Sequence, residues 1–156
     1  MGLFGAAAWP LRPSDGHSAS PPVAPADLLA LRGFDVVTYF LDGAAPRPGR
    51  PDLELAWKGR AWRFVSAANR TVFREAPATY APRLDGFDPV AMAQGRLVEA
   101  DPLVFARLPF GAAEPLYLFR HDANRAAARQ QPGIVAEAEA RWPSLLRGLT
   151  DLRFPD

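Results

Sequence analysis

The 156-residue sequence contains no cysteine, two histidines and a single lysine, and its charges nearly cancel to a net value of +1. Without cysteine the chain can form neither a disulfide nor a thiolate metal site, and it has no thiol nucleophile. The small net charge and the absence of a basic stripe argue against a nucleic-acid partner. No apolar run approaches the ~18 residues of a membrane-spanning helix. We therefore expect a protein without a membrane span that forms its own hydrophobic core.

The first 26 residues are rich in proline, serine and glycine, a composition that is typical of a flexible leader. His17 lies in this leader. The apolar stretch over residues 3–9 is short for an export signal, and no lysine or arginine precedes it. We expect a cytoplasmic protein, or a periplasmic one if the true start of the protein lies upstream.

Two short motifs occur twice in the remaining sequence. Gly33-Phe34-Asp35 recurs as Gly86-Phe87-Asp88, 53 positions later, and Ala68-Asn69-Arg70 recurs as Ala123-Asn124-Arg125, 55 positions later. The second spacing also relates three pairs of residues, namely Trp62 and Tyr117, Phe64 and Phe119, and Pro77 and Pro132. Self-similarity at a constant spacing indicates an internal duplication. We expect a first copy over residues 27–84 and a second copy, with a C-terminal helix, over residues 85–156.

Each copy carries the local signals of a helix, a hairpin and a second helix. Four polar residues stand where a side-chain oxygen can accept the free N–H groups at a helix N-terminus, namely Asp35, Asp88, Ser66 and Asp122. The first two precede short helices expected over residues 36–41 and 89–94. The other two precede helices that carry the repeated triplets, and Pro77 and Pro132 interrupt these helices.

Between these helices, alternating apolar residues predict one β-hairpin in each copy. The first hairpin turns at Lys58-Gly59, and the second pairs residues 103–108 with residues 116–119. We expect the hairpins to join by their edges or by their faces into a small sheet, because an isolated two-stranded ribbon is marginally stable. A helical stripe predicts an amphipathic C-terminal helix that covers both copies, formed by Ile134, Ala138, Trp142, Leu145 and Leu149. The predicted fold is α+β, with two similar helix–hairpin–helix repeats in one compact domain.

These segments resemble the YHS-domain family, in particular its two-part bacterial members. The resemblance is carried by residues 32–40, 62–73, 77–82 and 138–143. It implies a metal-binding module, since metal-binding members carry cysteines after an Asp-Pro-Val opening and twice in a Phe-Cys-Ser-x-x-Cys segment. Other residues stand at those positions here, namely Thr38, Val65 and Asn69 in the first copy and Ala91, Arg120 and Asn124 in the second. Because these are poor ligands for soft metals, we expect no such metal site and no cofactor.

Two groups of polar residues are candidates for a binding site. Asn69-Arg70 and Asn124-Arg125 occur in both copies, so their guanidinium groups could face a shared groove and bind a carboxylate or phosphate. Alternatively, each arginine covers its own apolar surface and each asparagine completes a local hydrogen-bond network. His121, beside Asp122, could act as a general base or as a ligand for a hard metal ion. The aromatic residues Trp57, Trp62, Tyr117 and Trp142 line a pocket or belong to the core.

The sequence contains no phosphate-binding glycine loop, no nucleophile elbow and no cofactor fingerprint. Without a catalytic constellation, we expect no enzyme but a binding or protein-interaction module of the YHS type that has lost its cysteine metal site. Its expected partner is another protein or a small anion. Two alternatives remain, a metal-binding or metal-trafficking protein with histidine and carboxylate ligands, and a small hydrolase built around His121, Asp122 and the arginines.

Overall fold

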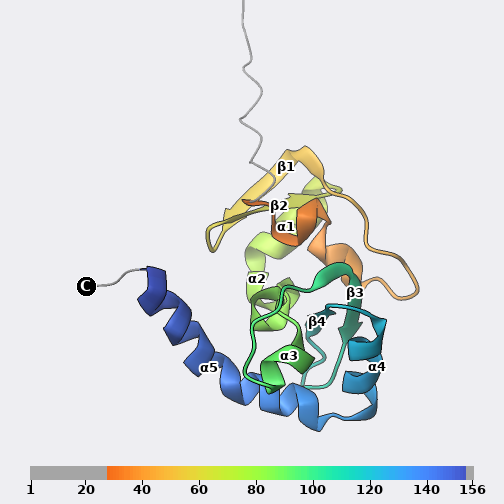
Figure 1. The fold of residues 1–156 in the computed structure, drawn as a ribbon. Coiled ribbons are helices and arrows are strands. Elements are labelled where there is room, and N and C mark those ends of the chain that lie inside the picture. The colour runs from red at the N-terminus through yellow and green to blue at the C-terminus, as the bar shows by residue number, and fades with distance from the viewer. Residues whose placement is uncertain (1–27, 154–156) are drawn as a thin grey trace, which may run out of the picture.

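The computed structural model describes residues 28–153. The leader expected over residues 1–26, with His17, lies outside the described residues. The described chain has an α+β fold, with helices and two small antiparallel sheets (Figure 1). Among these residues, no helix combines the length and the apolar character that a membrane crossing requires.

Residues 28–82 are called the first half below, and residues 83–153 the second half. The first half contains η2 (Ala30–Gly33), η3 (Val36–Phe40), β1 (Arg50–Trp57), β2 (Arg60–Phe64), α1 (Ala67–Glu75) and α2 (Pro77–Tyr80). The second half contains η4 (Arg83–Gly86), α3 (Pro89–Ala93), β3 (Asp101–Arg107), β4 (Leu116–Phe119), α4 (Asp122–Gln130) and α5 (Gly133–Arg153). The short turn η4 spans the boundary that the sequence analysis places between residues 84 and 85.

Left-handed backbone conformations mark the turns. Lys58 and Gly59 have φ of 48° and 71°, as expected for a tight hairpin turn between β1 and β2. In η2 the last three residues have positive φ, namely Leu31 at 53°, Arg32 at 51° and Gly33 at 87°. The corresponding residues of η4 follow the same course, namely Leu84 at 57°, Asp85 at 52° and Gly86 at 81°. Five non-glycine residues, Lys58 among them, are thus held in a conformation that L-residues seldom adopt.

Three of the four predicted helix caps are confirmed. Asp35 accepts a hydrogen bond from the Val37 backbone N–H, Asp88 from Ala91, and Ser66 from Asn69. The prediction for Asp122 is wrong. Helix α4 begins one residue earlier than expected, at Asp122 itself, so His121 is the N-cap residue and its side chain makes no capping hydrogen bond.

The two hairpins form separate two-stranded sheets, so the predicted single sheet is wrong. In each hairpin the pairing register shifts near the start of the first strand, between Arg50 and Glu54 in β1 and between Asp101 and Phe105 in β3. Pro51 and Pro102 occupy these irregular stretches, and proline lacks the N–H that a further strand would need. The Pro102 carbonyl instead accepts a hydrogen bond from the Tyr39 hydroxyl at 2.9 Å.

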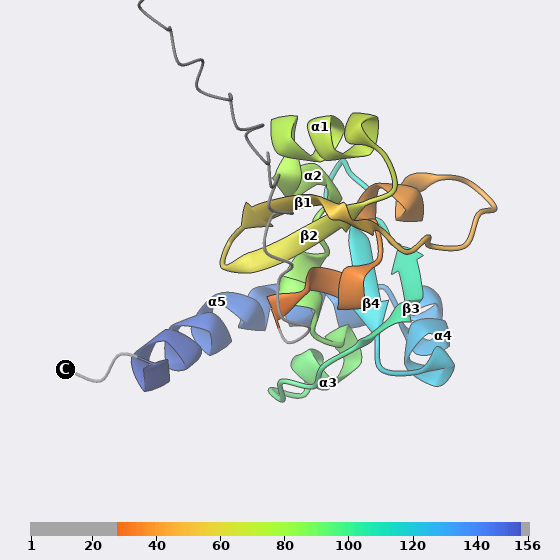
Figure 2. The same ribbon diagram turned by 90° about the horizontal axis from the view of Figure 1, so that it is seen from above.

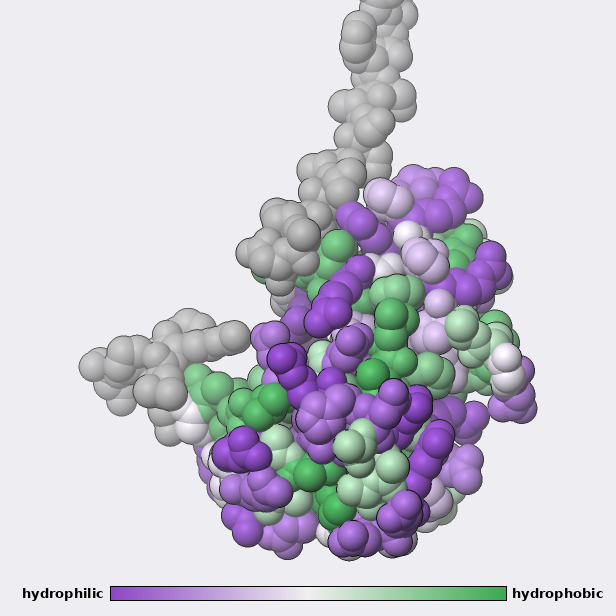
Figure 3. Space-filling model, turned by 45° about the vertical axis from the view of Figure 1, so that its right-hand side comes forward, coloured by the Kyte–Doolittle hydropathy of each residue, from purple (hydrophilic) through white to green (hydrophobic). Residues whose placement is uncertain are grey.

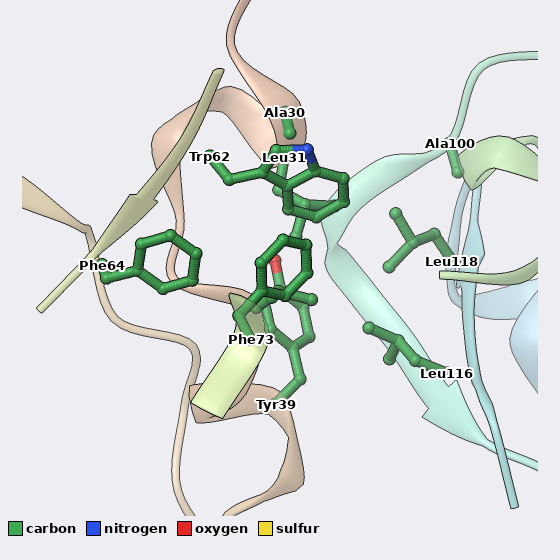
Figure 4. Close-up of a cluster of buried hydrophobic side chains, with 10 residues drawn as sticks. Ala30, Leu31, Tyr39, Trp62, Phe64, Phe73, Ala100, Leu116 and Leu118 are labelled. Atoms are coloured by element: carbon green, nitrogen blue, oxygen red, sulfur yellow. The ribbon is translucent and has the colours of Figure 1, made fainter. Parts of the chain in front are cut away.

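Side chains rather than strand pairing join the two hairpins. Strand β4 is buried along its whole length. Its Leu116 and Leu118 pack into a cluster with Trp62 and Phe73 of the first half (Figure 4). The alternate β4 residues Tyr117 and Phe119 belong to a second cluster with Met92, Val135 and Ala138. Because successive strand residues point to opposite faces, β4 serves both cores.

Helix α5 packs mainly on the second half and does not cover both halves as predicted. Its principal neighbours are α3, α4 and η4, and its C-terminal part extends away from the body of the molecule (Figures 1 and 2). The connection between α4 and α5 is short, so the first turns of α5 lie against α3. At 21 residues α5 is longer than the surface of the second half that it covers. Val135, Ala138 and Glu139 are buried, whereas Trp142 is only partly buried.

Candidate functional site

Each half buries one aspartate, and the first of these is Asp35. Its side chain is fully buried, and its Oδ1 atom caps η3 by accepting the Val37 N–H at 2.9 Å. Its Oδ2 atom accepts the backbone N–H of Val65, at the end of β2, and the side-chain amide of Asn69 in α1, each at 2.8 Å. One carboxylate therefore connects a turn, a strand end and a helix, and its three donors satisfy most of its hydrogen-bonding capacity.

Asp88 holds the corresponding position in the second half. It is also fully buried, and its Oδ1 accepts the Ala91 N–H at 2.9 Å. Its Oδ2 accepts the backbone N–H of Arg120 at 2.6 Å and the side-chain amide of Asn124 at 3.0 Å. The repeated asparagines thus complete local hydrogen-bond networks, which is one of the two roles that the sequence left open for them.

The structure does not bring the two repeated arginines to a shared groove. Arg70 lies on α1 and Arg125 on α4, and these helices are far apart in both ribbon views (Figures 1 and 2). Arg125 pairs with Asp122 at 2.6 Å and lies 3.5 Å from the Phe105 carbonyl oxygen. Neither arginine lines either of the two clefts described below.

His121 is exposed on the surface, immediately before α4. Its backbone carbonyl accepts the N–H groups of Asn124 and Arg125, at 3.1 and 3.3 Å. The neighbouring Asp122 carboxylate is engaged by Arg125, and it is itself 77% exposed. The structure therefore does not assemble an acid–base pair from His121 and Asp122.

Metal-ligating side chains do not gather within residues 28–153. No group of three or more histidine or carboxylate side chains there could hold a metal ion. The partly exposed Asp101 carboxylate accepts the Leu103 N–H at 2.9 Å and lies 3.7 Å from the Arg32 guanidinium. The surroundings of Asp35 and Asp88 present N–H donors, which do not coordinate cations.

The larger of two clefts lies where the halves meet and has a volume of about 800 Å³. Residues 29–32 of the first half and residues 83–87 of the second half both line it, and these segments contain most of η2 and the whole of η4, the two left-handed turns. Three of the four tryptophans also contribute, namely Trp57, Trp62 and Trp142. A cleft of this size, between two structural units and lined by aromatic rings, is typical of ligand sites.

The tryptophans were predicted to lie in the core or in a pocket, and the three described ones do both, Trp142 by packing against the second core cluster while it lines the larger cleft. Trp62 is 6% exposed and stacks on Phe73, with 4.8 Å between ring centroids. Its indole N–H donates to the Trp57 carbonyl at 3.1 Å, and the two indoles meet edge to face at 5.7 Å. Trp62 thus belongs to the first core cluster, Trp57 packs against it, and both also border the larger cleft.

A buried polar network that the sequence analysis missed lies beside this cleft. Arg83 donates two hydrogen bonds to the Glu139 carboxylate, at 2.8 and 2.5 Å, and the Tyr117 hydroxyl donates to the same carboxylate at 2.6 Å. Tyr117 is fully buried and Glu139 is 9% exposed, whereas the Arg83 side chain is 41% exposed. Glu139 lies one turn from Val135 and one turn from Trp142 on α5, so it shares their face of the helix. This spacing could have predicted that Glu139 is buried.

Burial and these hydrogen bonds shift two acid–base equilibria. Loss of solvent raises the pKa of the Tyr117 hydroxyl well above its usual value, and the Glu139 carboxylate adds to the effect. The hydrogen bond to Glu139 likewise raises the pKa of Arg83. Both groups therefore keep their protons, and the network acts as a fixed clamp between η4 and α5.

The smaller cleft, of about 490 Å³, lies on the other side of Arg83. Arg107 pairs with Glu114 at 3.7 Å and stacks over the Phe40 ring at 5.0 Å. Arg83 stacks over the Phe110 ring at 5.3 Å. Because the arginines in this cleft are already engaged by a carboxylate or a ring, it offers less unpaired charge to a ligand than the larger cleft.

The exposed large apolar side chains are scattered over the surface, and two of them, Phe110 and Leu146, line the clefts. The exposed ones in the described part of the chain are Leu28, Leu41, Val72, Leu103, Phe110 and Leu146. On the face shown in Figure 3, apolar side chains alternate with hydrophilic ones and form no continuous apolar surface. The larger cleft is therefore the leading candidate for a binding site. No family model matches the chain, and neither the curated proteins nor the solved structures with which it was compared include a match.

Proposed function

We propose that the protein is a non-enzymatic binding module, built from two copies of one YHS-like unit, that holds its partner in the cleft between the copies. The observation that carries this proposal is the cleft itself, about 800 Å³ in volume and lined by corresponding turns of both halves. A duplicated unit creates such a cleft at the junction of its copies, where neither copy alone has one.

The duplication is supported by hydrogen bonds that recur with the sequence spacing. The Asp35 carboxylate receives Val65 N–H and the Asn69 amide, and 53 to 55 positions later Asp88 receives Arg120 N–H and the Asn124 amide. Asp35 N–H donates to the Arg47 carbonyl at 2.8 Å, and Asp88 N–H to the Val98 carbonyl at 2.9 Å. The hairpins also share their register break.

A binding role without metal is supported by what surrounds the buried carboxylates. In the YHS family, as the resemblance implies, the residues at positions 65, 69, 120 and 124 would include metal-ligating cysteines. In this chain the same positions supply N–H donors to Asp35 and Asp88. Each aspartate with its donors therefore makes a cross-link of the kind that a metal ion would otherwise provide.

A binding role without catalysis is supported by the state of the candidate nucleophile and base. The Ser66 hydroxyl oxygen accepts the Asn69 N–H at 3.1 Å as a helix cap, and the exposed His121 lies on the other half. No general base is thus positioned on Ser66 within the described residues, as nucleophilic catalysis by serine requires.

Loss of partner binding in a cleft-filled variant tests the proposal. Ala78 is exposed and lines both clefts, so Ala78→Trp narrows them without entering the core. Two exposed positions serve as matched controls that should keep the partner, Thr79→Trp, which lines the smaller cleft only, and Ala67→Trp in α1, which lines neither cleft. We expect a partner recovered from extracts of the source cells to be kept by wild type and by both controls and lost by Ala78→Trp. Equal recovery by all three variants contradicts the proposal. Near-stoichiometric zinc, copper or iron in untagged protein contradicts the metal-free role.

A further inference from the structure

The two walls of the larger cleft carry opposite charges. From the first half, Arg32 in η2 and Lys58 and Arg60 at the hairpin turn line the cleft. From the second half, Asp85 in η4 and Glu99 before β3 line it together with Arg83, whose charge is paired with the Glu139 carboxylate. Arg32 and Asp85 stand at corresponding positions of the two left-handed turns, with φ of 51° and 52°. Corresponding positions in the two copies therefore present a cation on one side and an anion on the other.

Most of these charges have no partner within the described chain. Lys58 lies over the Trp57 ring, with its Nζ 4.7 Å from the centroid, and the Arg60 side chain makes no hydrogen bond or ion pair with described residues. The same holds for the carboxylates of Asp85 and Glu99, whereas Arg32 has a long contact of 3.7 Å with Asp101. Unpaired charges of both signs around a concave site favour a ligand with complementary charges of both signs.

Between the charged walls the cleft is apolar. Trp62, Leu84 and Trp142 line it together with proline and alanine side chains. A ligand that fills this volume gains from burying an apolar group between its charged ends. A polyanion would be repelled by the carboxylates of Asp85 and Glu99. A fatty acid carries no cation that could pair with these two carboxylates.

The mixed lining favours a short peptide as the ligand, because a peptide can carry charges of both signs on either side of an apolar side chain. Arg60 and Trp62 line the cleft from β2. Ala61 between them is already bridged to Leu29 of the same chain, so the peptide binds through its side chains and adds no strand to this edge.

On the basis of the proposed binding function, we infer that the cleft takes a peptide segment of another protein in which an apolar residue separates an acidic group from a basic group. The acidic side chains contact Lys58 and Arg60, and the basic side chains contact Asp85 and Glu99. The apolar residue lies against Trp62. The order of the charges along the peptide sets its direction in the cleft.

Selection from a phage-displayed library of random heptapeptides on the immobilised full chain tests this inference. Two double variants neutralise one wall each, Lys58→Asn with Arg60→Gln and Asp85→Asn with Glu99→Gln. Asparagine is used at positions 58 and 85 because it tolerates positive φ. The matched control, Arg74→Gln with Arg129→Gln, removes two exposed cations of α1 and α4 that do not line the cleft.

We expect the enriched heptapeptides to carry acidic and basic residues on opposite sides of an apolar one. By fluorescence anisotropy, each wall variant should weaken their binding about tenfold or more, with little change in the control. Enriched peptides of uniform charge, equal binding by all variants, or no enrichment would each overturn the peptide inference. Recovery of a cellular partner that Ala78→Trp loses would still support the proposed function in those cases, so the two failures are distinguishable.

Discussion

The side-chain amide of Asn69 donates a hydrogen bond to the fully buried carboxylate of Asp35 over 2.8 Å. The two residues are 34 positions apart, and their contact fixes the start of α1 against η3 and the end of β2. The corresponding pair in the second half, Asn124 and Asp88, makes the same contact over 3.0 Å.

Substitution of Asn69 tests the cross-link. Asn69→Ala should lower the free energy of unfolding by about 1.5 to 3 kcal/mol, since it removes a hydrogen bond to a buried charge. Asn69→Asp should cost more, because it places a second carboxylate beside Asp35. Urea unfolding monitored by circular dichroism measures both. Glu75→Ala, on the exposed end of α1, is the control and should change stability by less than about 0.5 kcal/mol. Equal, small effects for all three variants would show that the pair is not structural.

Alanine substitutions of two tryptophans compare the stability contribution of a core ring with that of a ring on the wall of the cleft. Trp62→Ala should destabilise the fold by about 3 to 5 kcal/mol, because the ring is buried and stacks on Phe73. Trp142→Ala should cost less than half as much, since this ring is only partly buried, on the wall of the cleft. Chemical denaturation of each variant checks the order. A larger loss for Trp142→Ala would mean that α5 contributes more to the core than the structure indicates.

The Arg83–Glu139–Tyr117 network should behave as one unit. Tyr117→Phe keeps the ring and removes the hydroxyl donor to Glu139, so we expect a loss of about 1.5 to 3 kcal/mol. Arg83→Gln should also destabilise, by about 2 kcal/mol, because it leaves a buried carboxylate without its cation while Arg83 itself is partly solvated. A double-mutant cycle measures their coupling, expected at about 0.5 kcal/mol or more. Strict additivity would contradict a shared network.

Alkaline pH should destabilise the protein through two buried tyrosines. Burial raises the pKa values of both Tyr39 and Tyr117 above the usual tyrosine value of 10.0 that applies in the unfolded chain. Above about pH 10 the unfolded state therefore binds fewer protons than the folded state, so the free energy of unfolding falls as pH rises. Below that pH these residues should produce no pH dependence.

Tyrosinate absorbance followed with circular dichroism measures this effect. We expect Tyr39 and Tyr117 to ionise together with unfolding, and Tyr117→Phe to reduce the slope of stability against pH. Ionisation of both hydroxyls in a folded protein near pH 10 would contradict their burial.

Much of the local structure follows from neighbouring residues and was predictable. The turn at Lys58-Gly59 and the caps Asp35, Asp88 and Ser66 depend on groups within a few positions of one another. The cap expected at Asp122 failed because one residue decides where α4 begins, and sequence signals do not fix helix ends to that accuracy.

The candidate site was less predictable. The repeated Asn-Arg motifs pointed to a groove with two arginines, but the asparagines face buried aspartates and Arg70 and Arg125 lie on separate helices. The cleft is lined instead by the two left-handed turns η2 and η4. The sequence showed that their motifs recur, but not that both turns line one cleft. The burial of Glu139 was also missed, because its partner Arg83 lies 56 positions away.

By itself the sequence determined the α+β class and the approximate positions of most elements, and it exposed the recurring motifs on which the duplication is proposed. These depend on short-range hydrogen bonds, apolar alternation and the backbone limits of glycine and proline. Only the tertiary structure decided that the hairpins remain separate sheets, that α5 packs on the second half, and that charges of opposite sign face each other across one cleft. Those features depend on packing between residues far apart in the chain, and no local pattern encodes which distant surfaces meet.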